Sequence, residues 1–355
     1  MSRFFLFVLV GIAALLTVAM FVTAGWDVPP VEATQQGFRG TAMNQFENPR
    51  EAEALEALNQ VPPPPYEIDM SGPKAGGFYE NVQVLTDIST GQFNRLMAAI
   101  TEWVAPEEEG CAYCHNLENM ADDSKYTHMV ARRMIQMTWE INREWVPHVQ
   151  QAGVTCYTCH RGMPVPQYIW FKETGPRMAG GLMGDRRGQN TAAQNIGSTS
   201  LNYDTLSHYL LRDEEIRVHS EKSVASPQKA LTRDAENTYA LMIHMSNALG
   251  VNCTYCHNSR AFNDWSQSTP QRITAWHGIE MSRSLNVNYL EPLGPVYPDY
   301  RLGPTGDAPK VNCTTCHQNI NKPLYGVSMV KDYPALAGPA QLDASDEDEM
   351  ASAAP

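Results

Sequence analysis

The strongest constraint on this chain is a five-residue pattern, Cys-x-x-Cys-His, that occurs four times. All eight cysteines of the 355 residues belong to it, and none is left over. In this pattern two thiols are spaced to bond a c-type haem, and the next histidine ligates its iron. The predicted attachment residues are Cys111, Cys114, Cys156, Cys159, Cys253, Cys256, Cys313 and Cys316, with His115, His160, His257 and His317 as proximal ligands.

Other uses of paired cysteines fit this pattern less well. A disulfide scaffold does not require a histidine after every second cysteine, and the chain is much longer than disulfide-stapled domains. A zinc site would combine two motifs in one tetrahedron, with no reason for an adjacent histidine in all four. A thioredoxin-like pair would occur once, after a strand. The sequence therefore predicts four covalently bound c-type haems that use every cysteine.

Each haem iron then needs a sixth protein ligand, which makes an electron-transfer centre, or an open position for a small molecule. Apolar periodicity predicts helices over 86–104, 124–146 and 226–250, each before one of the first three motifs, and a fourth over 269–284. A methionine lies on the apolar stripe of each of the first three helices. These candidate ligands are Met97, Met134 and Met242, with Met129, Met137 and Met245 as neighbouring alternatives.

The sixth ligand of the fourth haem has two candidates. Met281 is on the fourth helix but lies 36 residues before His317. His148 follows Pro147 in the short connection between the second helix and the second motif. Ligation by two histidines would lower the potential of this haem relative to Met/His ligation, and sequence spacing leaves both candidates open. Most other histidines outside the motifs, His128 among them, are expected at the surface or in satisfied core positions.

The order of helices and motifs predicts an internal duplication. The two motif histidines are 45 residues apart in the first half and 60 in the second, with 97 between the halves. We predict a mainly α fold: a duplicated helix-haem-helix-haem multihaem cytochrome domain with long loops, plus an N-terminal transmembrane helix. The expected divisions are a membrane anchor (1–25), an extended Pro-rich arm contacting membrane partners (26–80), the first two-haem half (81–171), a connecting loop (172–225), the second two-haem half (226–335) and an acidic tail (336–355).

Residues 4–24 form an apolar run without charge, long enough to cross a bilayer as a helix. Only Arg3 precedes it, which predicts a cytoplasmic N-terminus and an exported haem domain. The competing interpretation is a cleaved signal peptide. No cysteine lies at the end of the run, so lipid anchoring through an N-terminal cysteine is not expected.

The chain is acidic, with 39 acidic against 26 basic side chains and a formal net charge of −13. This balance argues against a nucleic-acid partner. Between positions 105 and 125 the local net charge is −5, whereas between 250 and 275 it is +1. We predict that Glu107, Glu108 and Glu109 form part of a negative patch beside the first haem that steers a basic carrier. The plainer alternative is a solvated turn after Pro106.

The chain resembles the tetrahaem cytochrome c subunit of the photosynthetic reaction centre of purple bacteria. The resemblance covers most of the sequence. Its matching stretches are Leu96-Met97-Ala98-Ala99 with Trp103-Val104, Ala131-Arg132-Arg133-Met134, Gly153-Val154-Thr155-Cys156-Tyr157-Thr158-Cys159-His160-Arg161-Gly162, Ala240-Leu241-Met242, Leu249-Gly250, Thr269-Pro270-Gln271-Arg272 and Asn288-Tyr289-Leu290.

The resemblance implies an iron ligand set. The first three haems would have His/Met ligation and the fourth would have two histidines. The implied pairs are Met97 with His115, Met134 with His160, Met242 with His257, and His148 with His317. Many members of that family carry a lipid-modified N-terminal cysteine, which this chain lacks. That departure favours a retained N-terminal helix.

The resemblance also implies a role, which is electron transfer and not enzymatic catalysis. Such a subunit re-reduces the photo-oxidised bacteriochlorophyll special pair with electrons from soluble cytochrome c2 or a high-potential iron-sulfur protein. Its implied partners are the reaction-centre membrane subunits L, M and H, surrounded by the light-harvesting antenna. The third haem would lie nearest the special pair and the first farthest from it. The implied location is the inner, photosynthetic membrane, with the haem domain periplasmic.

Two other functional classes compete with this one. A membrane-anchored multihaem quinol dehydrogenase feeding a periplasmic reductase also carries an anchor and four motifs, but it uses mostly two-histidine ligation in a shorter chain. A multihaem reductase would keep one iron open for a nitrogen or sulfur compound.

Overall fold

The computed structural model describes residues 3–23, 30–35, 43–173, 204–218 and 232–339. Within these ranges the chain is mainly helical, which confirms the predicted class, and its only strands form one antiparallel hairpin, β1 with β2. The elements in order are α1 (Arg3–Thr23), β1 (Glu32–Gln35), β2 (Asn44–Glu47), α2 (Pro49–Leu58), α3 (Ala75–Phe78), α4 (Thr90–Val104), η1 (Gly110–Tyr113), α5 (Tyr126–Glu144), α6 (Val146–Val149), α7 (Cys156–His160), α8 (Thr205–Leu210), α9 (Thr232–Leu249), η2 (Cys253–Tyr255), η3 (Trp265–Gln267), α10 (Pro270–Leu285), η4 (Asn286–Leu290), η5 (Glu291–Val296), η6 (Asp299–Arg301), α11 (Cys313–His317), η7 (Pro323–Gly326), η8 (Val330–Asp332) and η9 (Pro334–Leu336).

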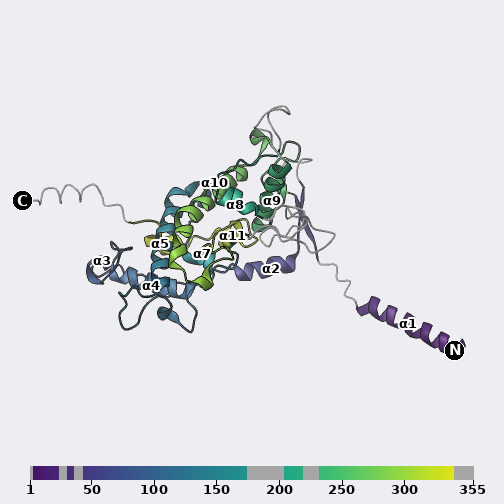
Figure 1. Cartoon of the computed structure of the whole chain (residues 1–355), viewed down its shortest axis with the longest axis horizontal. Helices are drawn as coiled ribbons and strands as arrows, with labels where there is room; N and C mark the ends of the chain where they lie inside the picture. Colours follow the sequence, from purple (N-terminus) through teal and green to yellow (C-terminus); the bar gives the residue numbers. More distant parts are fainter. Residues whose placement is uncertain (1–2, 24–29, 36–42, 174–203, 219–231, 340–355) are drawn as a thin grey trace, which may run out of the picture.

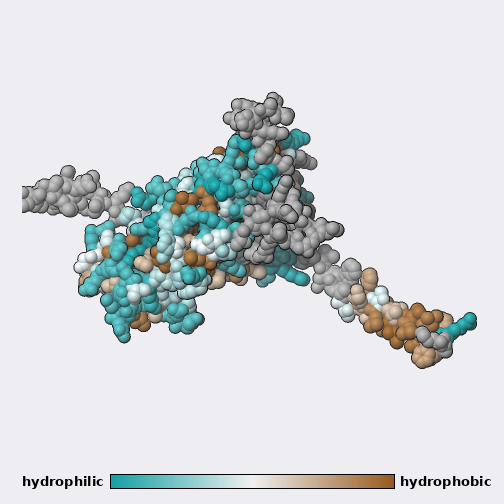
Figure 2. All heavy atoms as spheres, viewed as in Figure 1, coloured by the Kyte–Doolittle hydropathy of each residue, from teal (hydrophilic) through white to brown (hydrophobic). Residues whose placement is uncertain are grey.

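Helix α1 stands away from the helical body at the N-terminal end of the chain (Figure 1). It has no buried residue, and Figure 2 shows its surface as a nearly continuous hydrophobic rod. Its 21 residues give about 30 Å of helix, the thickness of a bilayer's hydrocarbon core. Among the described residues it is the one helix with the length and apolar composition to cross a membrane. A signal sequence would meet the same two criteria, so its retention stays a prediction.

The four helices predicted around the motifs are present. Helix α4 begins at Thr90 because Ser89 makes a reciprocal capping box with Gln92, and it ends before Pro106. Helices α5 and α10 lie within two residues of the predicted ranges 124–146 and 269–284. Helix α9 is described from Thr232, and its predicted start near position 226 lies outside the described residues. Most of the predicted connecting loop (172–225) and acidic tail (336–355) lies outside them as well.

The N-terminal arm is not extended throughout. It contains the β1–β2 hairpin and α2, where Asn48 caps the first turn by accepting a hydrogen bond from the Arg50 amide and Pro49 takes the first helical position. The sequence analysis predicted an extended arm here, although Asn48-Pro49 is a typical start of a helix. The arm also contacts the haem-motif region itself, since the Met43 amide donates to Thr254 Oγ1 over 3.1 Å.

The described residues form two hydrophobic cores, and segments that are distant in sequence meet in each of them. The first contains Leu96 and Trp103 of α4 together with Tyr333 from near the C-terminus. The second contains Leu241 of α9, Ile279 of α10 and Trp170, which comes from the end of the first predicted half. Each predicted half therefore supplies a residue to the core formed mainly by the other predicted half.

Candidate haem centres

The four motifs adopt two local structures that alternate along the chain. The first and third motifs lie in the single turns η1 and η2, and the second and fourth form the one-turn helices α7 and α11. Capping boxes start both helices, made by Thr155 with Thr158 and by Asn312 with Thr315. Both helices end at a left-handed residue, Arg161 or Gln318.

All four motif histidines are oriented in the same way. The Nδ1 atom of His115 lies 3.0 Å from the Met120 carbonyl oxygen, and that of His257 lies 2.7 Å from the Phe262 carbonyl, five residues on in each case. The carbonyl partners of His160 and His317 lie three residues on, at 2.8 and 3.0 Å. A carbonyl only accepts, so each Nδ1 carries the proton and each Nε2 keeps the lone pair that ligates a metal.

Burial supports the same protonation state. It lowers the pKa of His160 and His257 below the usual range and lowers that of His317 to about 4. Neutral imidazole is therefore the favoured form of these three side chains, and it is the form that binds a metal.

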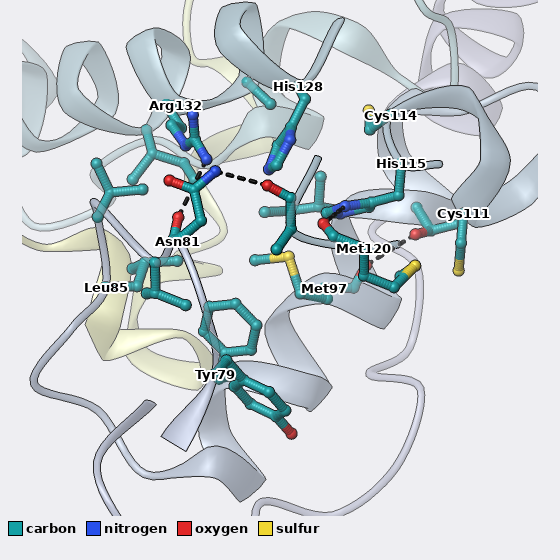
Figure 3. Close-up of a pocket in the computed structure, with 18 of the residues that line it drawn as sticks. Tyr79, Asn81, Leu85, Met97, Cys111, Cys114, His115, Met120, His128 and Arg132 are labelled. Atoms are coloured by element: carbon teal, nitrogen blue, oxygen red, sulfur yellow. Dashed lines mark hydrogen bonds between the residues drawn. The ribbon is translucent and has the colours of Figure 1, made fainter. Parts of the chain in front are cut away.

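A cavity of about 580 Å³ lies beside the first motif. It is lined by Met97 of α4, Cys111, Cys114 and His115, which are the residues predicted for the first haem. Figure 3 shows the Met97 thioether and the His115 ring both pointing into it. Its volume is in the range of cavities that hold small organic ligands and cofactors.

Sequence reasoning missed one side of this cavity. His128 lies 4.6 Å from His115 between ring centroids, and Arg132 forms an ion pair of 2.8 Å with Asp123. His128 also faces Asp123, at 3.3 Å, and burial lowers its pKa. In the sequence, His128 and Arg132 are marked only by their spacing of four residues, which puts them on one face of α5. That spacing does not indicate which motif the face contacts.

Met134 and Met242 are half-buried on α5 and α9. Met242 packs against the second core together with its neighbour Met245, whereas Met129, the alternative on α5, is 39% exposed. The pairing of Met134 with His160 and of Met242 with His257 stays a prediction.

His148 on the short helix α6 faces the fourth motif. Its ring centroid lies 6.0 Å from that of His317, and its Nδ1 lies 2.9 Å from the Thr274 carbonyl oxygen. Two imidazoles that bind one metal ion from opposite sides, each through a bond of about 2 Å, have ring centres about 6 Å apart. The separation of the two rings therefore suits His148 as the second ligand of the iron that His317 binds.

The cysteines show one departure from the predicted arrangement. Cys159 and Cys316 are joined by a disulfide, with Cα atoms 4.4 Å apart, and the other six are free. The physical reason is that α7 packs against α11, which brings the second cysteines of two motifs together. A sulfur in a disulfide cannot also form a thioether, so haem attachment at Cys159 and Cys316 stays a prediction.

Burial changes the acidity of three of the free thiols. Burial raises the pKa of Cys156 and Cys313 to about 12 and that of Cys256 to about 11, so these thiols stay protonated near neutral pH. In the described part of the chain no three His, Cys, Asp or Glu side chains converge as a metal ion would require.

The predicted acidic patch is on the surface. Glu107, Glu108 and Glu109 are exposed in the turn that leads into η1. Leu117 and Met120, which follow the same motif, are also exposed, at 65% and 49%. An apolar centre beside acidic side chains is a typical make-up of a docking surface. Asp122 and Asp123, by contrast, are held by hydrogen bonds from Ser124, Asn81 and Arg132.

The third motif lies beside the arm and an aromatic surface. Asn252 and Thr254 hydrogen-bond to the Met43 backbone, at 3.3 and 3.1 Å. The Arg272 guanidinium stacks 3.9 Å over the Trp265 ring. Its positive charge lowers the pKa of Cys256, against the larger effect of burial, which raises that pKa. Trp265 is 49% exposed, so an apolar surface lies open beside this motif.

A family model and three relatives at 43–50% identity show one family. The family model described as photosynthetic reaction centre cytochrome C subunit matches residues 27–337. The chain is 50% identical over 329 residues to the photosynthetic reaction center cytochrome c subunit of Rubrivivax gelatinosus, covering 92% of this chain and 89% of that protein. The proteins of the same name from Thermochromatium tepidum and Roseobacter denitrificans are 46% and 43% identical, covering 91% and 93% of this chain and 79% and 92% of theirs. The comparisons give no support to a quinol dehydrogenase.

Proposed function

The chain belongs to the family of photosynthetic reaction centre cytochrome c subunits, and from this premise we propose that it carries four covalent haems along which electrons pass from a soluble carrier to the photo-oxidised special pair. The observation that carries this proposal is the common orientation of the four motif histidines, each with Nδ1 on a backbone carbonyl and Nε2 free for iron. The haem group supplies reversible one-electron Fe(III)/Fe(II) chemistry when bound.

We propose that each iron is ligated by two of the chain's own residues. We assign Met97 with His115, Met134 with His160, Met242 with His257 and His148 with His317. The shared cavity supports the first pair, and the 6.0 Å ring separation supports the fourth. A protein ligand on both sides of each iron leaves no open position, which suits electron transfer and not catalysis.

We propose that the two halves arose by duplication. Besides the alternating motif structures, Thr127 Oγ1 donates to the Tyr113 carbonyl and Thr269 Oγ1 to the Tyr255 carbonyl, both over 2.6 Å and fourteen residues. These matching bonds support an equivalence of α4, η1, α5 and α7 with α9, η2, α10 and α11.

Helix contacts support an order of sites along the molecule. Helix α4 of the first site packs on α7 of the second, α7 packs on α11 of the fourth, and α11 packs on α9 of the third. Figure 1 has α7 and α11 side by side in the centre of the body. We infer that the four sites follow one another in space in the order first, second, fourth, third. In the mature protein Cys159 and Cys316 would be bonded to haem instead of to each other.

The third site is proposed as the membrane-facing end. Helix α1 ends at Thr23, and the arm that follows it hydrogen-bonds to the third motif through Met43. Gln45 of the same arm donates to the carbonyl of Gly250, just before this motif, over 3.2 Å. We propose a cytoplasmic N-terminus, a retained anchor and a periplasmic haem domain on the inner membrane. The exposed surface around Trp265 would then meet the L and M subunits, with H and the antenna completing the complex.

The count of four haems is tested by removing one motif. In the variant Cys111→Ala/Cys114→Ala the covalently bound haem, measured per chain by pyridine haemochrome absorbance, should fall from four to three, because each thioether bond needs a thiol and none remains at this site. Leu117→Ala, which changes an exposed side chain of the same loop, should keep all four. Equal haem contents in the double variant and the parent chain would contradict the assignment.

We propose that the acidic patch is where a basic carrier, cytochrome c2 or another soluble donor, delivers electrons. Replacing Glu107, Glu108 and Glu109 by Gln should lower the rate of carrier oxidation at low ionic strength by roughly threefold to tenfold and flatten its salt dependence. The measurement is flash-induced carrier oxidation over a series of salt concentrations. The matched control replaces three exposed glutamates of α2, Glu51, Glu53 and Glu56. Identical salt dependence in both triple variants would disprove this docking site.

A further inference from the structure

We propose that Gly278 of α10 is a positioning residue for the fourth haem, because it leaves the space that the His148 imidazole occupies and so holds that ring opposite His317. This inference rests on the proposed function, in which His148 is an iron ligand. In this inference α10 helps to orient the His148 ring, in addition to α6, which carries that residue.

The space at Gly278 is filled by the His148 ring. A Cβ atom on residue 278 would lie 2.6 Å from Cε1, 2.9 Å from Nδ1 and 3.2 Å from Nε2 of His148. The first two distances are far below a van der Waals contact. Any side chain at this position must therefore move the imidazole or separate α6 from α10.

Helix propensity does not explain a glycine here. Position 278 lies inside the 16-residue helix α10 and is buried. Glycine in a helix interior is less stable than alanine because the flexible backbone loses more entropy on folding. Alanine would thus be favoured at this position if only the helix mattered, and the close approach of His148 is the reason for its absence.

The same turn of α10 also orients the ring. The Thr274 carbonyl, one turn before Gly278, accepts the Nδ1 proton of His148 over 2.9 Å. The backbone of α6 holds the residue in place, since the His148 amide donates to the Trp145 carbonyl over 2.8 Å. With Nδ1 fixed, the lone pair of Nε2 is free to face the ring of His317, 6.0 Å away between centroids.

The first experiment compares two glycine variants of the full chain, assembled with haem. In Gly278→Ala the low-spin EPR signal of one haem in four should be lost or converted to a high-spin signal, and its midpoint potential should change. Gly294→Ala is the matched control, because a Cβ there meets nothing within 4 Å, and it should keep all four low-spin signals. Retention of the parent spectrum and potential in Gly278→Ala would overturn the positioning role.

A second pair of variants separates this inference from the proposed ligation. His148→Gly should lose the same low-spin signal, and added imidazole should restore it by binding in the vacated space. If His148→Gly loses the signal while Gly278→Ala keeps it, the positioning role fails and the ligand assignment stands. If His148→Gly keeps the signal, the ligand assignment fails and the positioning role fails with it.

A failure of Gly278→Ala to assemble is resolved by the double variant Gly278→Ala/His148→Gly with imidazole. Because the clashing ring is gone, this variant should assemble with four haems and a restorable low-spin signal. If the double variant also fails to assemble, the methyl group clashes with something other than His148, and the inference is overturned.

Discussion

Replacing His148 by Met should raise the midpoint potential at the fourth motif by on the order of 100 mV, a modest part of the ~0.8 V over which axial ligands move haem potentials. The physical reason is that a thioether stabilises the reduced iron relative to an imidazole ligand. His148 faces His317 at a ring separation of 6.0 Å, so it is the side chain whose replacement should change that site. A redox titration monitored optically and by EPR would resolve one component that moves upward while three stay in place.

The control for this prediction is Met281→Leu. Met281 is the alternative candidate by its place on α10, where it is half-buried. Leucine has a similar volume and lacks the sulfur, so core packing is preserved and any iron–sulfur bond is lost. The potential at the fourth motif should not change in this variant. A shift in Met281→Leu with none in His148→Met would assign the ligand to Met281 instead.

Removing the third motif should abolish the fast re-reduction of the special pair, whereas removing the first should preserve it for one turnover. The variants are Cys253→Ala/Cys256→Ala and Cys111→Ala/Cys114→Ala, and each should retain three haems. The expected difference follows from the proposed order of sites, in which the third lies at the end held by the N-terminal arm. The first site lies beside the acidic patch, at the opposite end of the proposed order of sites.

The measurement is the decay of the flash-oxidised special pair in membranes without added carrier. Both variants need a haem count and co-purification with the reaction centre, which show that the remaining sites are assembled. Under repeated flashes with the soluble carrier, re-reduction of the special pair should then become slower in the first-motif variant, because the site that accepts electrons from the carrier is missing. Equal loss of the fast phase in both variants would reject the proposed direction of electron flow.

Much of the candidate site is encoded locally and was therefore predictable. Cys-x-x-Cys-His places two thiols and one imidazole within five residues, so the chemistry is set by positions that a short turn or a one-turn helix brings together. The helices carrying Met97, Met134 and Met242 follow from apolar periodicity and end signals. Their observed boundaries differ by a few residues because capping, such as the box between Ser89 and Gln92, decides where a helix starts.

Contacts between distant segments were not predictable in the same way. Spacing left His148 and Met281 open for the fourth haem, and the packing of α6 against α10 favours His148 by bringing it to His317. Gly278 had no distinguishing signal, since its role appears only when a ring from α6 occupies the space beside it. His128 lines the first cavity for a similar reason, because the start of α5 is tied to η1 by the hydrogen bond from Thr127 to the Tyr113 carbonyl.

The sequence by itself therefore determined the cofactor class, the helical class and the apolar N-terminal helix, and it predicted the proximal ligands, because each depends on residues that are neighbours in the chain. Only the tertiary structure decided which motifs touch, which histidine faces His317, and that Tyr333 and Trp170 each enter the core of the other half. The physical reason is that such contacts depend on how the hydrophobic faces of whole helices pack, and many side chains share in that packing. A periodic pattern reveals that a face is buried, but the identity of its partner is set by the fold.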